Sequence, residues 1–481
     1  MVKPVYDSIV VRIELDRASM VPLFRQLYLG MRDEIISRRL APCMRLPPTR
    51  ALADHLSIAR NTVINAYEQL VAEGYLEALV GSGTRVASEL PIEASAMPPS
   101  RLLAMAQRPM EPRVRSRPTG IFTIDEPALD AFPYETMRRL ITNRMREDFP
   151  ALLGNADPAG LQQLRKAVAS YISSERGIAC SANEVVITAG SLHGLDLVGR
   201  AIGLARRLVA VENPGDISAR HNLEAAGATL VPIPVGEDGC DTEQLMRHGR
   251  GIRLACLTPS NQYPMGGTMP LARRLALLDW AGQTGTLIFE DDADSEFRYA
   301  TRPLAPMKAL DRAGVAVYAA TFSRILMPQL RLGYLVLPQR LVEPVITARQ
   351  ITDRHPPPLE QVMVADFIER GHFAIHIRRM RKLYRDRQRA LVGSLRRQLP
   401  SGIDVRPAGP GINTIIQLPD GTDDVGIAAA AEREKIYVQP LSRNYFAKPV
   451  RSGLLVGNAL SNIRDVRTEA RRLAEVLKGW L

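Results

Sequence analysis

Cysteine is scarce in this sequence and widely spaced. The four residues, Cys43, Cys180, Cys240 and Cys256, form no Cys-x-x-Cys pair, which excludes a zinc knuckle and a disulfide framework. The sequence also lacks a run of about 18 apolar residues, and charged residues interrupt its start before an apolar signal segment forms. We therefore expect a protein of the reducing cytoplasm that is neither exported nor membrane-spanning.

Acidic residues are outnumbered by basic ones, 51 against 62, which gives a net charge of +11 and an isoelectric point near 9.7. This excess suits a polyanionic partner, although charge alone speaks to solubility and nonspecific binding rather than to fold. The 481 residues exceed one ordinary domain, so we expect two or three domains.

Helical periodicity dominates residues 21–77. Apolar residues at a spacing of four place one face of a helix toward a core, namely Leu23, Leu27, Met31 and Ile35. Pro47 and Pro48 end this pattern, and Thr49 is then the expected N-cap of a helix over 50–56. A second short helix is predicted over 61–73, followed by extended stretches at 75–78 and 84–87 around a glycine-rich tip. The order is that of a helix-turn-helix followed by a wing.

The composition changes after residue 87. Residues 88–119 are rich in Pro, Ser, Ala, Met and Arg without a sustained period, which indicates a linker. From residue 121 onward, apolar runs such as 184–188, 253–257 and 286–289 alternate with helical segments, which predicts a buried parallel sheet in an α/β domain. The predicted organisation is a mainly α DNA-binding domain over 1–87, a linker over 88–119 and an α/β domain over 120–481.

The motifs of the first domain are dense, at 45–53, 59–63, 66–76 and 81–84. They resemble the winged helix-turn-helix of GntR-type regulators. A helix whose N-terminal turn presents Arg60, Asn61 and Thr62 offers base-edge donors and phosphate contacts in a major groove, and the wing glycines permit close approach to a minor groove. Each arginine alone would suit a solvated surface equally well, but their joint placement favours duplex DNA. The predicted DNA-binding residues are Arg45, Thr49, Arg50, Arg60, Asn61, Thr62, Gly81, Ser82, Gly83, Thr84 and Arg85.

The motifs of the second domain lie at 154–161, 187–191, 212–215, 257–264, 290–299 and 321–337. Together they resemble the fold-type-I aminotransferase domain of the MocR subfamily of GntR-type regulators. The resemblance implies a site related to that of pyridoxal phosphate. It also implies a homodimer in which each DNA-binding domain lies against the large domain of the partner.

The resemblance assigns Asp291 to the pyridine nitrogen of the cofactor, Arg331 to its phosphate and Ser191 to the phosphate turn. Three other contacts are lost. Arg324 stands at the position of the Schiff-base lysine, and none of the seven lysines has a matching context. Ala293 stands where the family has a tyrosine, and Asp216 where it has a stacking aromatic residue.

A guanidinium has no free lone pair at neutral pH and cannot form the aldimine that a lysine amine forms. Leu192 and His193 also replace a polar pair in the phosphate turn. We therefore predict a transcription regulator that binds an operator duplex and is not an enzyme, with no catalytic residue, no metal site and no covalent cofactor.

The ligand of the second domain stays open at this point. The predicted site comprises Ser191, Asn261, Asp291, Arg324 and Arg331, and a carboxylate or phosphate effector would suit its two arginines. Noncovalent pyridoxal phosphate, held through Asp291 and Arg331, is one alternative. A domain that only dimerises is another, and a pyridoxal-phosphate-dependent aminotransferase is the rival class.

Overall fold

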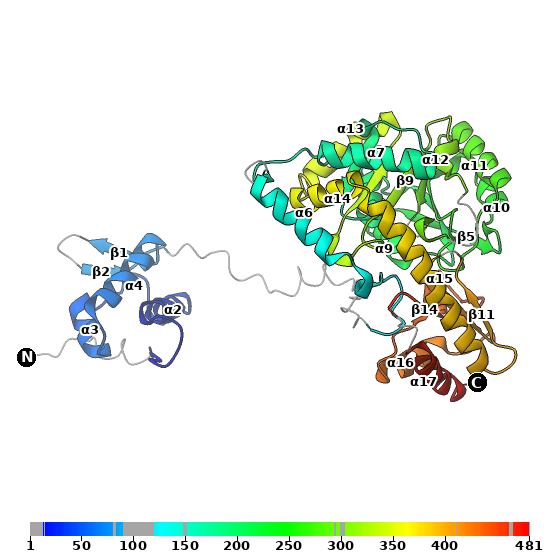
Figure 1. Cartoon of the computed structure of the whole chain (residues 1–481). Helices are drawn as coiled ribbons and strands as arrows, with labels where there is room; N and C mark the ends of the chain where they lie inside the picture. Colours follow the sequence, from blue (N-terminus) through cyan, green and yellow to red (C-terminus); the bar gives the residue numbers. More distant parts are fainter. Residues whose placement is uncertain are drawn as a thin grey trace, which may run out of the picture. The chain divides into compact units, whose positions relative to one another are not determined.

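The structure is a computed structural model of the 481-residue chain. It describes residues 13, 15–79, 83–89, 120–147, 152–292, 295–298, 304–409, 411–460 and 465–480. Gly81 and Ser82 of the predicted wing, most of the predicted linker and Ala293 lie outside the described residues. The chain divides into two compact units, Met1–Ser116 and Arg117–Leu481 (Figure 1), and the predicted domain boundaries stay a prediction.

The first unit is a helix-turn-helix followed by a two-stranded wing, as predicted. Its elements are α2 (Leu23–Ile36), α3 (Thr49–Leu56), α4 (Arg60–Ala72), β1 (Leu76–Leu79) and β2 (Gly83–Val86). The strands pair antiparallel, with Leu76 opposite Val86. The predicted apolar face of α2 is largely buried, with Leu27, Met31 and Ile35 in the core of the unit. The helical period of the sequence therefore identified the correct face.

The expected capping role of Thr49 is wrong. Thr49 is the first residue of α3 and Pro48 is the N-cap, without a side-chain hydrogen bond. Pro48 has φ −56° and ψ 144°, an extended conformation that a proline adopts readily and that leads directly into a helix. The Thr49 hydroxyl is thereby left for another contact, described below.

The second unit contains an eight-stranded sheet in the order β3-β10-β9-β8-β7-β4-β5-β6. Its strands are β3 (Val185–Thr188), β4 (Leu208–Asn213), β5 (Thr229–Gly236), β6 (Gly239–Cys240), β7 (Ile252–Leu257), β8 (Leu287–Asp291), β9 (Ala316–Thr321) and β10 (Gly333–Val336). The predicted parallel sheet is only partly correct, because β10 runs antiparallel to both of its neighbours and β6 runs antiparallel to β5. Strands β3, β8, β9 and β10 are buried almost throughout, so periodicity could not reveal their direction.

Helices cover this sheet (Figure 1). They are α6 (Tyr134–Glu147), α7 (Gln162–Arg176), α8 (Ser191–Ile202), α9 (Ile217–Ala225), α10 (Thr242–Arg247), α11 (Leu271–Thr284), α12 (Met307–Leu310), α13 (Gln339–Thr352) and α14 (Pro358–Glu369). Three apolar clusters share the sheet. One is centred on α7, α14 and the buried aromatic residues, the second on α8 and α13, and the third on α11. Among the described residues, no helix is long and apolar enough to cross a membrane.

A smaller layer completes the second unit. Its four strands form an antiparallel sheet in the order β11-β12-β14-β13. The strands are β11 (Asp404–Pro407), β12 (Asn413–Leu418), β13 (Gln439–Pro440) and β14 (Ser452–Gly457), and the helices are α16 (Asp424–Arg433) and α17 (Val466–Lys478). The long helix α15 (His372–Gln398) packs on both the large and the small layer, because its apolar residues belong to the cores of both. The observed fold is thus mainly α in the first unit and α/β in the second.

Candidate functional site

The first turns of α3 and α4 meet in the DNA-binding unit. Arg60 Nε donates to Thr49 Oγ1 over 3.4 Å, which places the start of α4 beside the start of α3. Arg50 and Asn61 are exposed next to this contact. The free N–H groups of two helix starts and two exposed arginines make a positive surface that suits a phosphate backbone.

The wing carries its own basic residue, already paired within the strand pair. Arg85 Nη2 lies 2.7 Å from Glu77 Oε2, and Arg85 Nε donates to the same oxygen over 2.9 Å. Arg45 is exposed, and its guanidinium lies against Gly83, whose φ is +87°. To bind a DNA phosphate, the Arg85 guanidinium would first have to leave the carboxylate of Glu77. Arg45 would not have to break an ion pair of this kind.

The second candidate site lies at the carboxyl edge of the large sheet. Asp291 ends β8, Thr321 ends β9, and the chain segments after β4 and β7 reach the same edge because these strands are parallel neighbours. Ligand sites in open α/β sheets form outside this edge. Antiparallel β10 begins here with Gly333, whose Cβ would lie 2.6 Å from Ala320 O and 2.9 Å from Gly190 Cα. Only glycine allows this approach of strand to turn.

Arg324 lies inside this site and is neutralised there. Its Nη2 is 3.3 Å from Asp125 Oδ2, and its guanidinium carbon is 6.0 Å from the ring centroid of Tyr263. Its side chain is only 21% exposed. A guanidinium held between a carboxylate and an aromatic ring is well stabilised. We therefore expect the Arg324 side chain to stay in this position beside the cavity.

Asp291 is the most perturbed carboxyl of the site. Burial raises its pKa to about 7, and the nearby Asp216 acts in the same direction, while Arg324 and a hydrogen bond from the Ser191 hydroxyl lower it. Its Oδ1 is buried without a hydrogen-bond partner among the described residues. A buried oxygen of this kind is costly unless a ligand or water supplies a donor.

The surrounding side chains are mostly acidic or amide groups. A cavity of about 30 Å³ is lined by Asp216, Thr258, Asn261, Tyr263, Asp291, Asp292 and Arg324. A second cavity of the same size shares Asp216, Thr258 and Asp291 with it. Asp216 also caps α9, accepting from Ser218 N over 2.6 Å, so its carboxylate is fixed beside the cavity.

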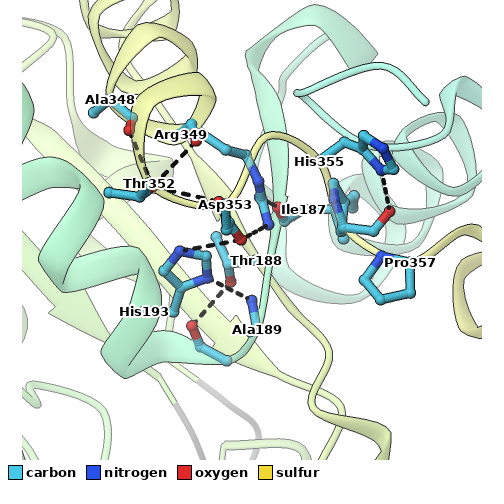
Figure 2. Close-up of polar contacts among 12 residues, drawn as sticks. Ile187, Thr188, Ala189, His193, Ala348, Arg349, Thr352, Asp353, His355 and Pro357 are labelled. Atoms are coloured by element: carbon cyan, nitrogen blue, oxygen red, sulfur yellow. Dashed lines mark hydrogen bonds and ion pairs between the residues drawn. The ribbon is translucent and has the colours of Figure 1, made fainter. Parts of the chain in front are cut away.

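His193 supports the turn that leads into α8. Figure 2 shows its ring between this turn and the end of α13, where Ala189 N–H donates to His193 Nδ1 over 3.0 Å. Burial and the charge of Arg349 lower the pKa of His193, so the neutral ring carries its proton on Nε2. That atom lies 3.7 Å from Asp353 Oδ2, which also accepts from Arg349 Nη2 over 3.1 Å.

The predicted ligand residues are only partly brought together. Ser191 bonds to Asp291, and Asn261, Asp291 and Arg324 line one cavity. Arg331 is exposed, does not line that cavity and adopts the left-handed conformation with φ 43°. A non-glycine residue in this region stores strain of a kind often found at functional sites.

Sequence reasoning missed Asp125, Tyr263 and Asp353 as members of the site. Asp125 reaches Arg324 from a segment 199 residues earlier in the chain, and no local pattern marks it. The positive φ of Asp125, 63°, is a feature of the folded chain alone. Tyr263 lies within the motif at 257–264, so the sequence placed it near the site. Its contact with Arg324 could not be predicted from the sequence.

Comparisons with known proteins agree with both units. Residues 23–86 match the family of bacterial regulatory proteins named gntR, and residues 128–453 match aminotransferase class I and II. The chain is 37% identical to the probable rhizopine catabolism regulatory protein MocR of Rhizobium meliloti, over 92% of each chain. It is 32% identical to the HTH-type transcriptional regulator TauR of Rhodobacter capsulatus, over 85% of this chain and 86% of TauR.

Solved structures resemble the second unit. The α-aminoadipate aminotransferase LysN from Thermus thermophilus matches with a TM-score of 0.69 and 28% identity, over 75% of this chain and 92% of LysN. The kynurenine aminotransferase of Pyrococcus horikoshii matches with a TM-score of 0.70 and 26% identity, over 81% and 96%. The second unit therefore has the fold-type-I aminotransferase fold.

A winged helix-turn-helix and an aminotransferase-like domain in one chain define a class of DNA-binding transcription regulators. The chain belongs to the GntR family of bacterial regulatory proteins, in its MocR subfamily. The predicted fold class and family are confirmed. The part that each predicted residue plays in binding DNA or a ligand stays a prediction.

Proposed function

We propose that this regulator reads an operator duplex through α4, has no transaminase activity and senses an amine-bearing molecule in the cavity beside Asp291. A homodimer in the cytoplasm is part of the proposal. The observation that carries it is the placement of Arg324, ion-paired with Asp125 at the position where the family has its Schiff-base lysine.

DNA reading is assigned to the first turn of α4. Arg60, Asn61 and Thr62 are at its start, exposed or half-buried, while Val63 and Tyr67 anchor the helix in the core. This geometry lets side chains reach base edges while the rest of the helix stays rigid. Thr49, Arg50 and Arg45 would hold phosphates on either side, together with the wing residues Gly83, Thr84 and Arg85.

The DNA assignment is tested with a duplex selected from a random-sequence pool by the full-length protein. Arg60→Ala should weaken its binding by about 1–3 kcal/mol in gel-shift titrations at fixed salt and relax sequence preference. Arg39→Ala is the matched control, since Arg39 is exposed and pairs with Glu34 over 2.8 Å. Equal losses in both variants, or none in either, would exclude α4 as the reader.

Three features count against pyridoxal phosphate in the second unit. Arg324 cannot form an aldimine and occupies part of the site. Asp216 presents a carboxylate where the cofactor ring would need a stacking face. The two cavities that Asp291 lines are each about 30 Å³, whereas drug-sized ligands take several hundred. The described residues therefore do not fit this cofactor.

The charge of the site favours a cationic ligand instead. Asp125, Asp216 and Asp291 stand against the guanidinium of Arg324 at the first cavity, and the second cavity is lined by Glu212, Asp216 and Asp291 against Arg220. The unpartnered Asp291 Oδ1 needs a donor, and a cavity of this size admits an ammonium head group. An amine that donates to Asp291 would also stabilise the ionised form of its carboxyl.

The ligand assignment predicts a pH dependence. The protein is screened by thermal shift against primary amines, amino acids, carboxylates, phosphates and pyridoxal phosphate, and hits are titrated by calorimetry. Because the pKa of Asp291 is about 7, affinity for an amine should rise about tenfold from pH 6 to pH 8 as this carboxyl ionises. Asp291→Asn should abolish the rise. Hits confined to anions, or affinity that falls with pH, would contradict the proposal.

A further inference from the structure

The positive charge of this chain is concentrated on one helix. Helix α15 carries eight arginines and one lysine against a single aspartate, so it holds a net charge of +8 in a chain whose total is +11. The rest of the second unit is therefore close to neutral. A charge distribution of this kind is the electrostatic footprint of a polyanion site.

The charges follow one face of the helix. Five basic residues recur at intervals of four, three, four and seven positions, which places them within an arc of about 60° at 3.6 residues per turn. We call this surface the basic stripe: Arg378, Lys382, Arg385, Arg389 and Arg396. At 1.5 Å per residue the stripe is about 27 Å long, about three quarters of one turn of duplex DNA.

The stripe is presented to solvent and only partly paired. Arg378, Lys382 and Arg389 are exposed, and no hydrogen bond or ion pair engages their side chains among the described residues. Arg385 Nε lies 3.2 Å from Asp386 Oδ1, and Arg396 Nε donates to Val405 O over 2.9 Å. The guanidinium of Arg396 is thereby oriented, and three charges remain available to a partner.

The opposite face of α15 fixes the stripe in place. Phe373, Ile377, Met380, Tyr384 and Leu391 are buried in the cores of the large and small layers. The helix therefore cannot rotate, and its charges form a rigid row. Ile375 is the exposed large apolar residue of this helix, so α15 has no continuous free apolar face to insert into a lipid surface, which an amphipathic membrane helix requires.

We propose that the basic stripe is a second DNA-contact surface, which binds the phosphate backbone of duplex DNA flanking the operator. A duplex is a rod with one charge per about 1.7 Å, and a straight row of cations matches one side of it. The proposed contacts of these arginines and lysine are with phosphates, which carry no sequence information, so this contact is independent of sequence. In a chain that already binds DNA, flanking duplex is present at high local concentration.

The inference rests on the proposed function in one respect, namely that the chain binds an operator. The test therefore uses two duplexes that share one selected core, the first trimmed to the core and the second extended by random sequence on both sides. Flanks of about 50 base pairs, roughly 170 Å at about 3.4 Å per base pair, are sufficient, because residues 88–119 span at most about 110 Å even when fully extended. Full-length protein is titrated with both duplexes between 50 and 200 mM salt.

The test variant is Arg378→Gln/Lys382→Gln/Arg389→Gln. The matched control, Arg467→Gln/Arg471→Gln/Lys478→Gln, removes the same charge from exposed positions of α17, where Glu469 and Glu475 balance part of the charge. Glutamine keeps the helix propensity of these positions. Circular dichroism and urea titration of each variant confirm that the fold is retained.

Wild-type protein should bind the extended duplex more tightly than the trimmed one. The α15 variant should lose about tenfold or more in affinity for the extended duplex at 100 mM salt, with the salt slope reduced by about 2–3, because each phosphate contact contributes about 0.9. It should bind the trimmed duplex like wild type, and the α17 control should match wild type throughout.

Equal binding of both duplexes by wild type, or equal behaviour of the α15 and α17 variants, would overturn the stripe as a DNA surface. Capture of the protein by anionic vesicles that the α15 variant loses, without an effect of flanking DNA, would overturn it in favour of a lipid partner. Failure of wild type to bind even the selected core would instead contradict the DNA-reading proposal itself.

Discussion

Replacing Asp291 with asparagine should change how the stability of the second unit depends on pH. Burial holds the pKa of this carboxyl at about 7 in the folded chain, against about 3.9 when unfolded. Between these values the folded state keeps a proton that the unfolded state releases. Raising the pH therefore destabilises the fold, and the asparagine variant, which cannot ionise, escapes this loss.

The magnitude follows from the two pKa values. One such group lowers the free energy of unfolding by about 1.4 kcal/mol from pH 6 to pH 8, and by about 2.6 kcal/mol from pH 5 to pH 8. Glu212 and Glu290 are also buried, with pKa values raised to about 7, and they add slopes of the same sign. The difference between wild type and Asp291→Asn isolates the share of Asp291, because the other two groups are present in both proteins.

Urea titration followed by tryptophan fluorescence measures this difference. Both tryptophans, Trp280 and Trp480, lie in the second unit, so the signal reports on that unit alone. The advantage of the variant over wild type should grow from pH 5 to pH 8. A difference that stays constant within about 0.3 kcal/mol would refute the assignment of a buried, protonated Asp291.

The neighbouring carboxylate gives the opposite result in the same assay. Asp292 accepts hydrogen bonds from Tyr318 over 2.7 Å and Ser295 over 2.8 Å, and it pairs with the buried Arg176. These partners hold its pKa below the usual range, despite burial. Asp292→Asn should be destabilising by about 3–5 kcal/mol at pH 7, since it leaves Arg176 buried without a counter-charge. Its stabilising contribution should disappear in wild type as the pH falls below about 4.

The remaining predictions concern pyridoxal phosphate and the buried ion pair of α14. Arg324→Lys alone should not give a yellow protein that retains the cofactor, because Asp216 still lacks an aromatic face and the cavities beside Asp291 remain small. An absorbance spectrum that shows a full complement of aldimine would contradict this prediction. Borohydride treatment of wild type followed by mass spectrometry should find no pyridoxyl adduct on any of the seven lysines, and transaminase assays should be negative. Asp366→Asn should lower the free energy of unfolding of the second unit by about 3 kcal/mol, since the Asp366 side chain is 3% exposed and pairs with Arg144 over 2.6 Å. Glu135→Gln is the control and should be nearly neutral, because the ion pair of Glu135 with Arg138 is exposed.

The helix-turn-helix was predictable because its determinants are local. The spacing of apolar residues in α2, the two prolines before α3 and the glycine-rich wing each act within a few residues, and together they determine the element order. The N-cap of α3 was missed for a local reason too, because Pro48 already supplies an extended residue before the helix. Such boundaries are decided by small energy differences.

The absence of a Schiff-base amine at position 324 was also readable from the sequence. The identity of residue 324 determines whether an amine is present, and no fold can give a guanidinium a free lone pair. The same holds for Asp216, whose side chain has no aromatic face wherever it points. What a residue cannot do chemically is therefore determined before folding.

What the site can do was decided by the tertiary structure. Asp125 and Arg324 are 199 residues apart and meet only because the chain folds back over the carboxyl edge of the sheet. The pKa of Asp291 depends on burial, and Arg331 is exposed in a left-handed conformation and does not line the cavity. Likewise, the sequence alone determined that α15 is basic, but only packing of its apolar face decided that the charges form one fixed row. Charge and chemistry are carried by each residue, whereas burial, distance and direction arise from contacts between segments that are remote in the chain.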